Sequence, residues 1–267
     1  MSFRTDPKVV AGVLPRPLRP PGEPLAAAFV TRYPKTNFGV TYHEGALLVA
    51  ADYRGERGWY CLSMPVDDDT ATICGREQFG FPKKMAGRIT LDRDGPHVTG
   101  SVVRNGVELL RFEGEFVDPQ RPGVHVLGGP AVDPESRPCE KLVSFLFKYF
   151  PAAADGGTFE HSPGLVRQVT LFRPRPGQLT GATKLELSST TCHPLGEIPV
   201  RQILAAGYGV FDNTMLPGRV VRRVYNQWRF APKSLFKNDA FALADPGSLP
   251  VLTLGERRHQ NKQLRTY

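Results

Sequence analysis

The stretch "GRITLDRDGPHVTGSVVRNGVELLRFEGEF", Gly87–Phe116, alternates apolar and polar residues along three runs that two turn dipeptides separate. These dipeptides, Asp94-Gly95 and Asn105-Gly106, are preferred where a hairpin needs positive φ angles. Alternation with a period of two places every second side chain on the same face of a strand. The stretch therefore predicts an antiparallel meander with one buried face.

The segments on both sides of this meander indicate that the same architecture continues. They are rich in β-branched and aromatic residues and are bounded by turn residues: "LAAAFVTRY", "FGVTYHEGALLVAADY" and "GWYCLSMPV" before it, and "LVRQVTLFRP" and "TKLELSS" after it. The 27 glycines and 25 prolines also favour many turns and short strands. We therefore expect a mainly β fold, an antiparallel β-barrel or sandwich-like domain with a few helices.

Three segments are predicted as helices. In "TDPKVVAGVLP", Thr5 or Asp6 can cap a short helix and Pro7 suits its first turn. "CEKLVSFLFKYF", Cys139–Phe150, and "PVRQILAAGYGVF", Pro199–Phe211, also favour helix over strand. We expect one domain over residues 3–225. The aromatic-rich extension, residues 226–267, is expected to pack on that domain or on a second subunit.

Composition excludes several classes of function. The formal net charge is +8, but the positive residues are spread along the chain without a nucleic-acid-binding signature, so nucleic acid is not an expected partner. No run approaches the roughly 18 apolar residues of a membrane span. The four cysteines lie far apart, which predicts no metal site and a cytoplasmic protein with reduced thiols. They are Cys61, Cys74, Cys139 and Cys192.

The segment "CGREQFGFPKKMAGRITL" places two lysines, Lys83 and Lys84, behind a proline and among apolar residues. A free lysine amine has a pKa of about 10.4, so a nucleophilic amine needs burial or a nearby positive charge at neutral pH. Both are available here, because Phe79, Phe81 and Met85 surround the pair and each lysine places a positive charge beside the other. In an extended strand the two lysines point to opposite faces, so burial of the inward lysine is the larger effect. The structural alternative is that both lysines lie at the surface.

Two motifs in this segment carry a family resemblance. Gly75–Glu77 reads "GRE" and Phe81–Lys84 reads "FPKK", and together they resemble the hallmark of the acetoacetate decarboxylase family. In that family the first lysine of the pair forms a Schiff base with the substrate, which the resemblance places at Lys83, with Lys84 beside it. Acetoacetate decarboxylase is itself a known case of an amine activated by its surroundings.

The resemblance extends from about Phe3 to Tyr225. "FGVTYHEG" is similar to the family segment that carries an active-site glutamate, and places it at Glu44. "GATKLEL", followed by "HPLGEIPVRQIL", looks like the family's closing strand and helix, and "FRTDPKVVAGVLPRPL" looks like its early helix. The family's enzymes need no cofactor and are homo-oligomers, which the resemblance implies for this chain.

Two departures bear on the reaction. The family's decarboxylases carry a second acidic residue at a position that falls on Phe29. They also carry an arginine in an N-terminal region that corresponds to positions before Met1, so either the start of this sequence is truncated or the protein lacks that arginine. The resemblance implies decarboxylation of a small β-keto acid through a lysine imine. It also embraces members that condense a small oxo acid such as pyruvate with an aldehyde and dehydrate the product. A third reading is a non-catalytic barrel that binds a small molecule.

The expected site residues follow from these arguments. We expect Lys83, Glu44 and Lys84 to be catalytic. We expect Arg76, Tyr42, Phe29 and Phe81 to bind substrate. For Arg76 the alternative is a structural role, because Arg76 and Glu77 are adjacent opposite charges before a core segment.

Overall fold

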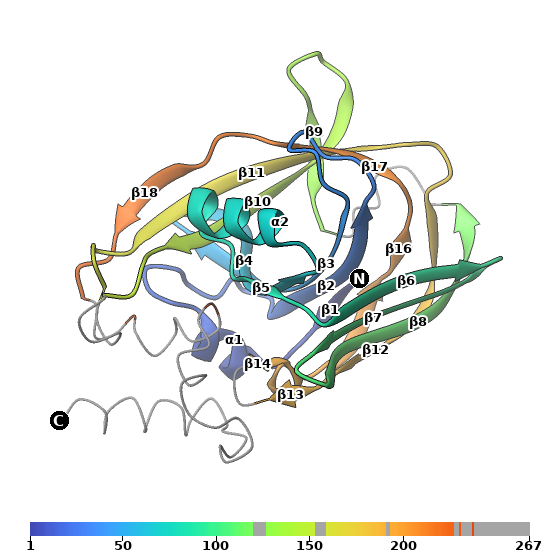
Figure 1. Ribbon diagram of the computed structural model, residues 1–267, viewed down its shortest axis with the longest axis horizontal. Helices are drawn as coiled ribbons and strands as arrows, with labels where there is room; N and C mark the ends of the chain where they lie inside the picture. Colours follow the sequence, from blue (N-terminus) through green and yellow to red (C-terminus); the bar gives the residue numbers. More distant parts are fainter. Residues whose placement is uncertain (120–126, 153–158, 191–192, 227–229, 231–236, 238–267) are drawn as a thin grey trace.

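The computed structural model describes residues 1–119, 127–152, 159–190, 193–226, 230 and 237. Most of these residues lie in strands that form two curled sheets (Figure 1). The fold is mainly β, as the sequence predicts. Nearly the whole extension after Tyr225 lies outside the described residues, apart from Asn226, Phe230 and Lys237.

The larger sheet has eleven strands. Its main path runs in the order β15 (Gln202–Ala205), β1 (Ser2–Arg4), β2 (Leu25–Tyr33), β3 (Tyr42–Tyr53), β4 (Glu56–Val66), β10 (Pro138–Lys148), β11 (Gly164–Pro174) and β17 (Phe211–Met215). Three strands pair off this path: β18 (Arg219–Arg223) with β11, β9 (Gly129–Val132) with β10, and β5 (Lys83–Met85) with β4. Most pairs are antiparallel, but β4 pairs in parallel with both β10 and β5.

The smaller sheet contains the predicted meander. Its order is β16 (Gly207–Tyr208), β12 (Leu179–Leu187), β8 (Val107–Pro119), β7 (His97–Arg104) and β6 (Arg88–Asp94). Asn105 and Gly106, between β7 and β8, have φ angles of 51° and 74°. These are the positive angles that the Asn-Gly dipeptide predicts for a hairpin turn. A two-stranded ribbon, β13 (Ser189–Thr190) and β14 (His193–Pro194), lies outside both sheets.

The helices among the described residues are few and short. Helix α1 (Pro7–Val13) is confirmed, with Asp6 as the N-cap that accepts hydrogen bonds from two backbone amides of the first turn. Helix α2 (Asp69–Cys74) continues into a π-helical turn, η1 (Gly75–Phe79), and a 3-10 turn, η2 (Leu195–Glu197), follows β14. Within the described ranges, no helix has the length and apolar character needed to cross a membrane.

The prediction of a helix over Cys139–Phe150 is wrong. The segment forms β10, which pairs with β11 over nine consecutive positions and with β4 at Ser144 and Phe145. Six consecutive residues of this strand, 142–147, are buried, so both of its faces are covered. A strand buried on both faces loses polar–apolar alternation and cannot be told from a buried helix by periodicity.

The prediction of a helix over Pro199–Phe211 is also wrong. The segment forms the short strands β15 and β16 and the first residue of β17. β15 pairs with β1, and β16 pairs with the start of β12. These pairings join segments that lie far apart in the sequence, and tertiary context of this kind overrides the helix propensity of residues such as Ala and Leu.

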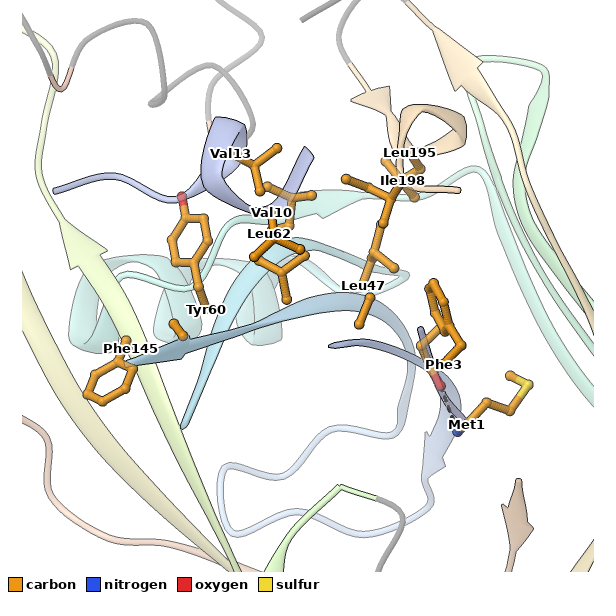
Figure 2. Close-up of a cluster of buried hydrophobic side chains, with 14 of the residues drawn as sticks. Met1, Phe3, Val10, Val13, Leu47, Tyr60, Leu62, Phe145, Leu195 and Ile198 are labelled. Carbon is orange, nitrogen blue, oxygen red and sulfur yellow. Dashed lines mark hydrogen bonds between the residues drawn. The ribbon is translucent and has the colours of Figure 1, made fainter. Parts of the chain in front are cut away.

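The main core lies between the sheets and beneath α1. Val10 and Val13 of α1 point toward Leu62 of β4, and Ile198 points toward Leu47 of β3 (Figure 2). β3 is buried along nearly its whole length. Its odd-numbered residues from Leu47 onward belong to this core, whereas Ala46 and Leu48 belong to a second apolar cluster on the opposite face. This second face of β3 carries Glu44.

Candidate active site

Glu44 and Lys83 meet across the strand that separates them. Glu44 on β3 lies opposite Val66 of β4, and Lys83 on β5 lies opposite Met64 of β4. Because directly paired residues point to the same face of a sheet, all four side chains share one face. On this face Lys83 Nζ lies 2.8 Å from Glu44 Oε2.

Both members of this pair are withdrawn from solvent. Lys83 is 6% exposed and Glu44 is 4% exposed. Charges this deeply buried persist in proteins only when they are paired or hydrogen-bonded. The short contact satisfies each group with the other, and it provides a direct path for a proton between Nζ and the carboxylate.

Tyr42 completes the polar part of the site. Lys83 Nζ lies 5.0 Å from the centroid of the Tyr42 ring, and the Tyr42 hydroxyl hydrogen-bonds to Glu44. Burial, with a smaller effect from the negative charge of Glu44, raises the pKa of Tyr42 well above its usual value. The hydroxyl therefore stays protonated and can donate its hydrogen to the carboxylate.

A second tyrosine, which the sequence did not single out, supports the first. The ring of Tyr33 on β2 stacks on that of Tyr42 with centroids 4.8 Å apart. Burial is also the largest cause that raises the pKa of Tyr33. Its hydroxyl accepts a hydrogen bond from the side-chain amide of Asn213 on β17. The stacked pair thus links the Glu44 carboxylate to the far edge of the large sheet.

Apolar side chains surround the remainder of the site. Phe81 is 6% exposed and lies in the second apolar cluster, and Phe29 is half-buried against the same cluster. Phe29 on β2 pairs with Ala46, two residues along β3 from Glu44, so its side chain shares the Glu44 face. The buried members of the cluster are Ala27, Ala46, Leu48, Cys61, Met64, Phe81, Leu146 and Val166.

Lys84 lies on the other face of β5. It pairs with Pro65, whereas Lys83 pairs with Met64, and successive residues of a strand alternate between faces. Lys84 is nevertheless 6% exposed, so both lysines are buried. The surface alternative for this pair does not hold, and the two lysines do not lie side by side.

Arg76 contacts the backbone of the lysine strand. Its Nη1 donates hydrogen bonds to the carbonyl oxygens of Lys83, at 2.9 Å, and of Lys237, at 2.8 Å. These two hydrogen bonds show that Arg76 has a structural role, and binding of substrate by Arg76 stays a prediction. Glu77, the next residue of the same motif, is exposed.

Gly75 makes room for the Lys83 side chain. A Cβ at this position would lie 2.6 Å from Cδ and 2.7 Å from Cε of Lys83. Gly75 and Arg76 belong to the π-helical turn η1, which ends at Gly80 with a left-handed φ of 91°. The "GRE" motif therefore acts through its glycine and arginine, which shape the place where Lys83 lies.

Two further neighbours have different roles. His43 turns away from the Glu44 face and pairs with Asp67, with 2.7 Å between His43 Nδ1 and Asp67 Oδ2. Cys61 is buried near the pair; burial is the main cause that raises the pKa of its thiol, with a smaller effect from Glu44. Among the residues that the structure describes, no three His, Cys, Asp or Glu side chains are grouped so that they could hold a metal ion.

The sequence matches one protein family over most of its length. The family model described as Acetoacetate decarboxylase (ADC) matches residues 1–225. The acetoacetate decarboxylase of Burkholderia vietnamiensis (strain G4 / LMG 22486) is 30% identical over 232 residues, which cover 83% of this chain and 84% of that protein.

Solved structures share the fold at lower identity. The crystal structure of acetoacetate decarboxylase from Legionella pneumophila superposes with a TM-score of 0.70 at 22% identity and covers 83% of each chain. The enduracididine biosynthesis enzyme MppR, complexed with the condensation product of pyruvate and imidazole 4-carboxaldehyde, superposes with a TM-score of 0.62 at 16% identity. That superposition covers 82% of this chain and 84% of MppR.

Proposed function

This chain belongs to the acetoacetate decarboxylase family, and from that membership we propose that it is a carbon–carbon lyase that decarboxylates a small β-keto acid through an imine on Lys83. The observation that carries the proposal is the buried contact of 2.8 Å between Lys83 Nζ and Glu44 Oε2. It combines the nucleophile with a group that can take and return its proton.

Imine formation begins when Glu44 accepts a proton from the Lys83 ammonium. The neutral amine then forms a bond from Nζ to the ketone carbon of the substrate. The carbonyl oxygen leaves as water, with one proton from Nζ and one returned by Glu44. The product is a protonated imine, whose positive nitrogen can accept an electron pair.

Loss of carbon dioxide follows from that electron sink. The bond between the α-carbon and the carboxylate breaks, and its electron pair moves toward the imine to give a neutral enamine. The α-carbon then takes up one proton, and water hydrolyses the imine to release the ketone and Lys83. Overall, one β-keto acid anion and one proton give one ketone and one carbon dioxide.

The apolar surroundings favour decarboxylation, the step in which the charge of the substrate carboxylate is lost. A carboxylate is less well solvated beside Phe29 and Phe81 than in water, whereas the neutral enamine and carbon dioxide lose little solvation in the same place. Tyr42 donates to Glu44 and keeps the carboxylate oriented toward Nζ. Lys84 lies on the opposite face of β5 and does not compete for the substrate carbonyl.

The second candidate function is an aldolase-dehydratase. It uses the same imine on Lys83, but the enamine of an oxo acid such as pyruvate attacks an aldehyde and water is then lost. Phe29 favours this candidate, because it stands where the resemblance places a second acidic residue of the decarboxylases. The shared fold with MppR, whose structure holds a condensation product of pyruvate, points the same way.

Product analysis separates the candidates. The protein is incubated with acetoacetate and, separately, with pyruvate plus an aromatic aldehyde, and released carbon dioxide and condensed product are both quantified. We expect carbon dioxide from acetoacetate, and no carbon dioxide from a Lys83→Arg variant. Condensed product without carbon dioxide would replace the first candidate with the second, and the absence of both products would favour a binding barrel.

A further inference from the structure

The strand that carries Lys83 has one paired edge and one outer edge. The Ala86 amide donates to the Val66 carbonyl at 2.7 Å, so the backbone groups of residues 84 and 86 point toward β4. The carbonyl groups of Lys83 and Met85 therefore point away from β4. Within the described part of the chain, β4 is the only strand that pairs with β5.

Two arginines hold this outer edge. Arg76 donates to the carbonyl of Lys83, and Arg104 of β7 donates to the carbonyl of Met85. Arg104 is itself held by His193, with 3.2 Å between Arg104 Nε and His193 Nε2. Hydrogen bonds from a charged donor are about twice as strong as neutral ones, so the two guanidinium groups substitute for a neighbouring strand. The position of the Lys83 backbone thus depends on them.

One of these arginines is shared with the C-terminal segment. The same Nη1 of Arg76 that binds the Lys83 carbonyl also binds the carbonyl of Lys237. Lys237 lies beyond the residues that the family model matches, which end at residue 225. A residue outside the family domain therefore touches the group that fixes the reactive lysine.

Lys237 and Phe230 both pack against the domain. The Lys237 side chain is 6% exposed; its Nζ donates to the carbonyl of Phe147 at 3.3 Å and lies 4.5 Å from the centroid of the Tyr149 ring. Phe230 is 3% exposed, and its ring centroid lies 4.9 Å from that of Phe147 and 5.2 Å from that of Tyr149. Both side chains contact the end of β10 or the residue just after it, so the Lys237 carbonyl is presented at a fixed place.

We propose that Lys237 is a positioning residue of the active site, which holds Arg76 in the orientation that places Lys83 beside Glu44. This inference rests on the proposed function, in which Lys83 forms the imine. Without Lys237, Arg76 has one carbonyl fewer to hold it and can turn away from β5. Lys83 Nζ would then meet a substrate carbonyl in the productive geometry less often.

Two measurements test the proposal in the full-length protein. The first is the rate at which pentane-2,4-dione forms a conjugated enaminone with Lys83, followed by near-ultraviolet absorbance and assigned by peptide mass. The second is hydrogen exchange at the Ala86 amide, which reports how firmly β5 pairs with β4. The variants are Lys237→Glu, Phe230→Ala and Arg76→Met, and Arg76→Lys is a second choice if Arg76→Met does not fold. Tyr225→Ala, at a side chain that is 77% exposed, is the matched control.

We expect Lys237→Glu and Phe230→Ala each to slow enaminone formation by about tenfold, since a small misplacement of a reacting group is costly. Both should speed exchange at Ala86, and Tyr225→Ala should change neither rate. In the Arg76→Met background, Lys237→Glu should have no further effect, because the contact it acts through is gone. Additive effects, or rates within twofold of the wild type, would overturn the positioning role.

The outcomes also separate this inference from the proposed function. If the wild type forms no enaminone at Lys83, the imine chemistry fails. Exchange at Ala86 in the same variants then still decides whether Lys237 positions β5: faster exchange supports the role, and unchanged exchange overturns it.

Discussion

Lys83 Nζ and Glu44 Oε2 lie 2.8 Å apart although β4 runs between the strands that carry them. The contact depends on a change of neighbouring strand along one edge of β4. β10 pairs with β4 at Trp59 and Tyr60, whereas β5 pairs with it at Met64 to Val66. The pairing register of β3 with β4 shifts by one residue between Leu47 and Leu48 of β3. β4 therefore carries one extra residue just before the part that pairs with β5. Bulges of this kind re-aim side chains and are common next to active sites.

Removal of the carboxylate should affect imine formation more than folding. Glu44→Gln keeps the shape of the side chain but cannot take the Lys83 proton. We expect imine formation to slow by about a hundredfold, the lower range for loss of a general base. Single-turnover trapping of the imine measures this rate. Glu77→Gln, an exposed change in the "GRE" motif, is the matched control and should leave it unchanged; an equal loss in both variants would contradict the role of Glu44.

The glycine beneath Lys83 offers a test that is selective for the side chain. In Gly75→Ala the new Cβ would meet Cδ and Cε of Lys83 within 2.7 Å, so the flexible lysine must move. We expect little loss of thermal stability but about a tenfold slower imine formation. Gly87→Ala is the control, because the nearest atom to its Cβ is 3.6 Å away and its φ is not positive. A fully active Gly75→Ala protein would show that this path of the Lys83 side chain is not needed.

The Tyr42 hydroxyl is separable from its ring. Tyr42→Phe removes the hydrogen bond to Glu44 but keeps the aromatic face near Lys83 Nζ. A hydrogen bond to a charged group contributes about 1.5–3 kcal/mol, and only part of it bears on the reaction, so we expect about a tenfold lower rate. Tyr42→Leu, which also removes the ring, should lower the rate further. Equal rates for the two variants would mean that the hydroxyl, and not the ring, carries the effect.

Docking of Lys237 should strengthen as the pH rises above neutral. Burial is the largest cause that lowers the pKa of Lys237, from 10.5 to about 7, and the nearby charges of Arg76 and Lys148 add to it. Between these two pH values Lys237 has released its proton when it is docked but keeps it when it is free, so docking of Lys237 becomes more favourable by up to about 1.4 kcal/mol per pH unit. Below about pH 7 the lysine is protonated in both states and the gain disappears. Tyr149 also faces the amine, through its ring.

The matched variant for this effect is Lys237→Met, which has no proton to release. Cleavage within residues 226–237 by a protease is compared between the two proteins at each pH, so that the pH dependence of the protease cancels. We expect the wild type to become better protected relative to Lys237→Met from pH 7 to pH 9. A constant ratio would show that the buried amine does not control docking.

The sequence predicted local structure well wherever one face of a strand is solvated. The meander and its turns follow from alternation and from Asn105-Gly106, whose positive φ angles are observed. The same reasoning failed for residues 139–150, because β10 is buried on both faces and its apolar run imitates a helix. It failed again for residues 199–211, where pairing with β1 and β12 decides the structure.

The candidate site was predictable in its residue types but not in its geometry. The apolar neighbours of the lysine pair marked Lys83, and the family resemblance marked Glu44 in the segment that also holds Tyr42. The structure brings Lys83, Glu44 and Tyr42 together. Tyr33 and Lys237 could not be found in this way, since the contacts of Tyr33 with Asn213 and of Lys237 with Arg76 join segments distant in the sequence. Alternation along a strand did predict that Lys83 and Lys84 lie on opposite faces.

Borohydride trapping identifies most directly which lysine forms the imine. The protein is treated with borohydride in the presence of acetoacetate and, separately, of pyruvate, and the modified residue is located by peptide mass. We predict a reduced adduct on Lys83 with at least one of the two acids, absent from Lys83→Arg and retained in Lys84→Met. An adduct on Lys84, or no adduct with either acid, would show that Lys83 does not act as the nucleophile.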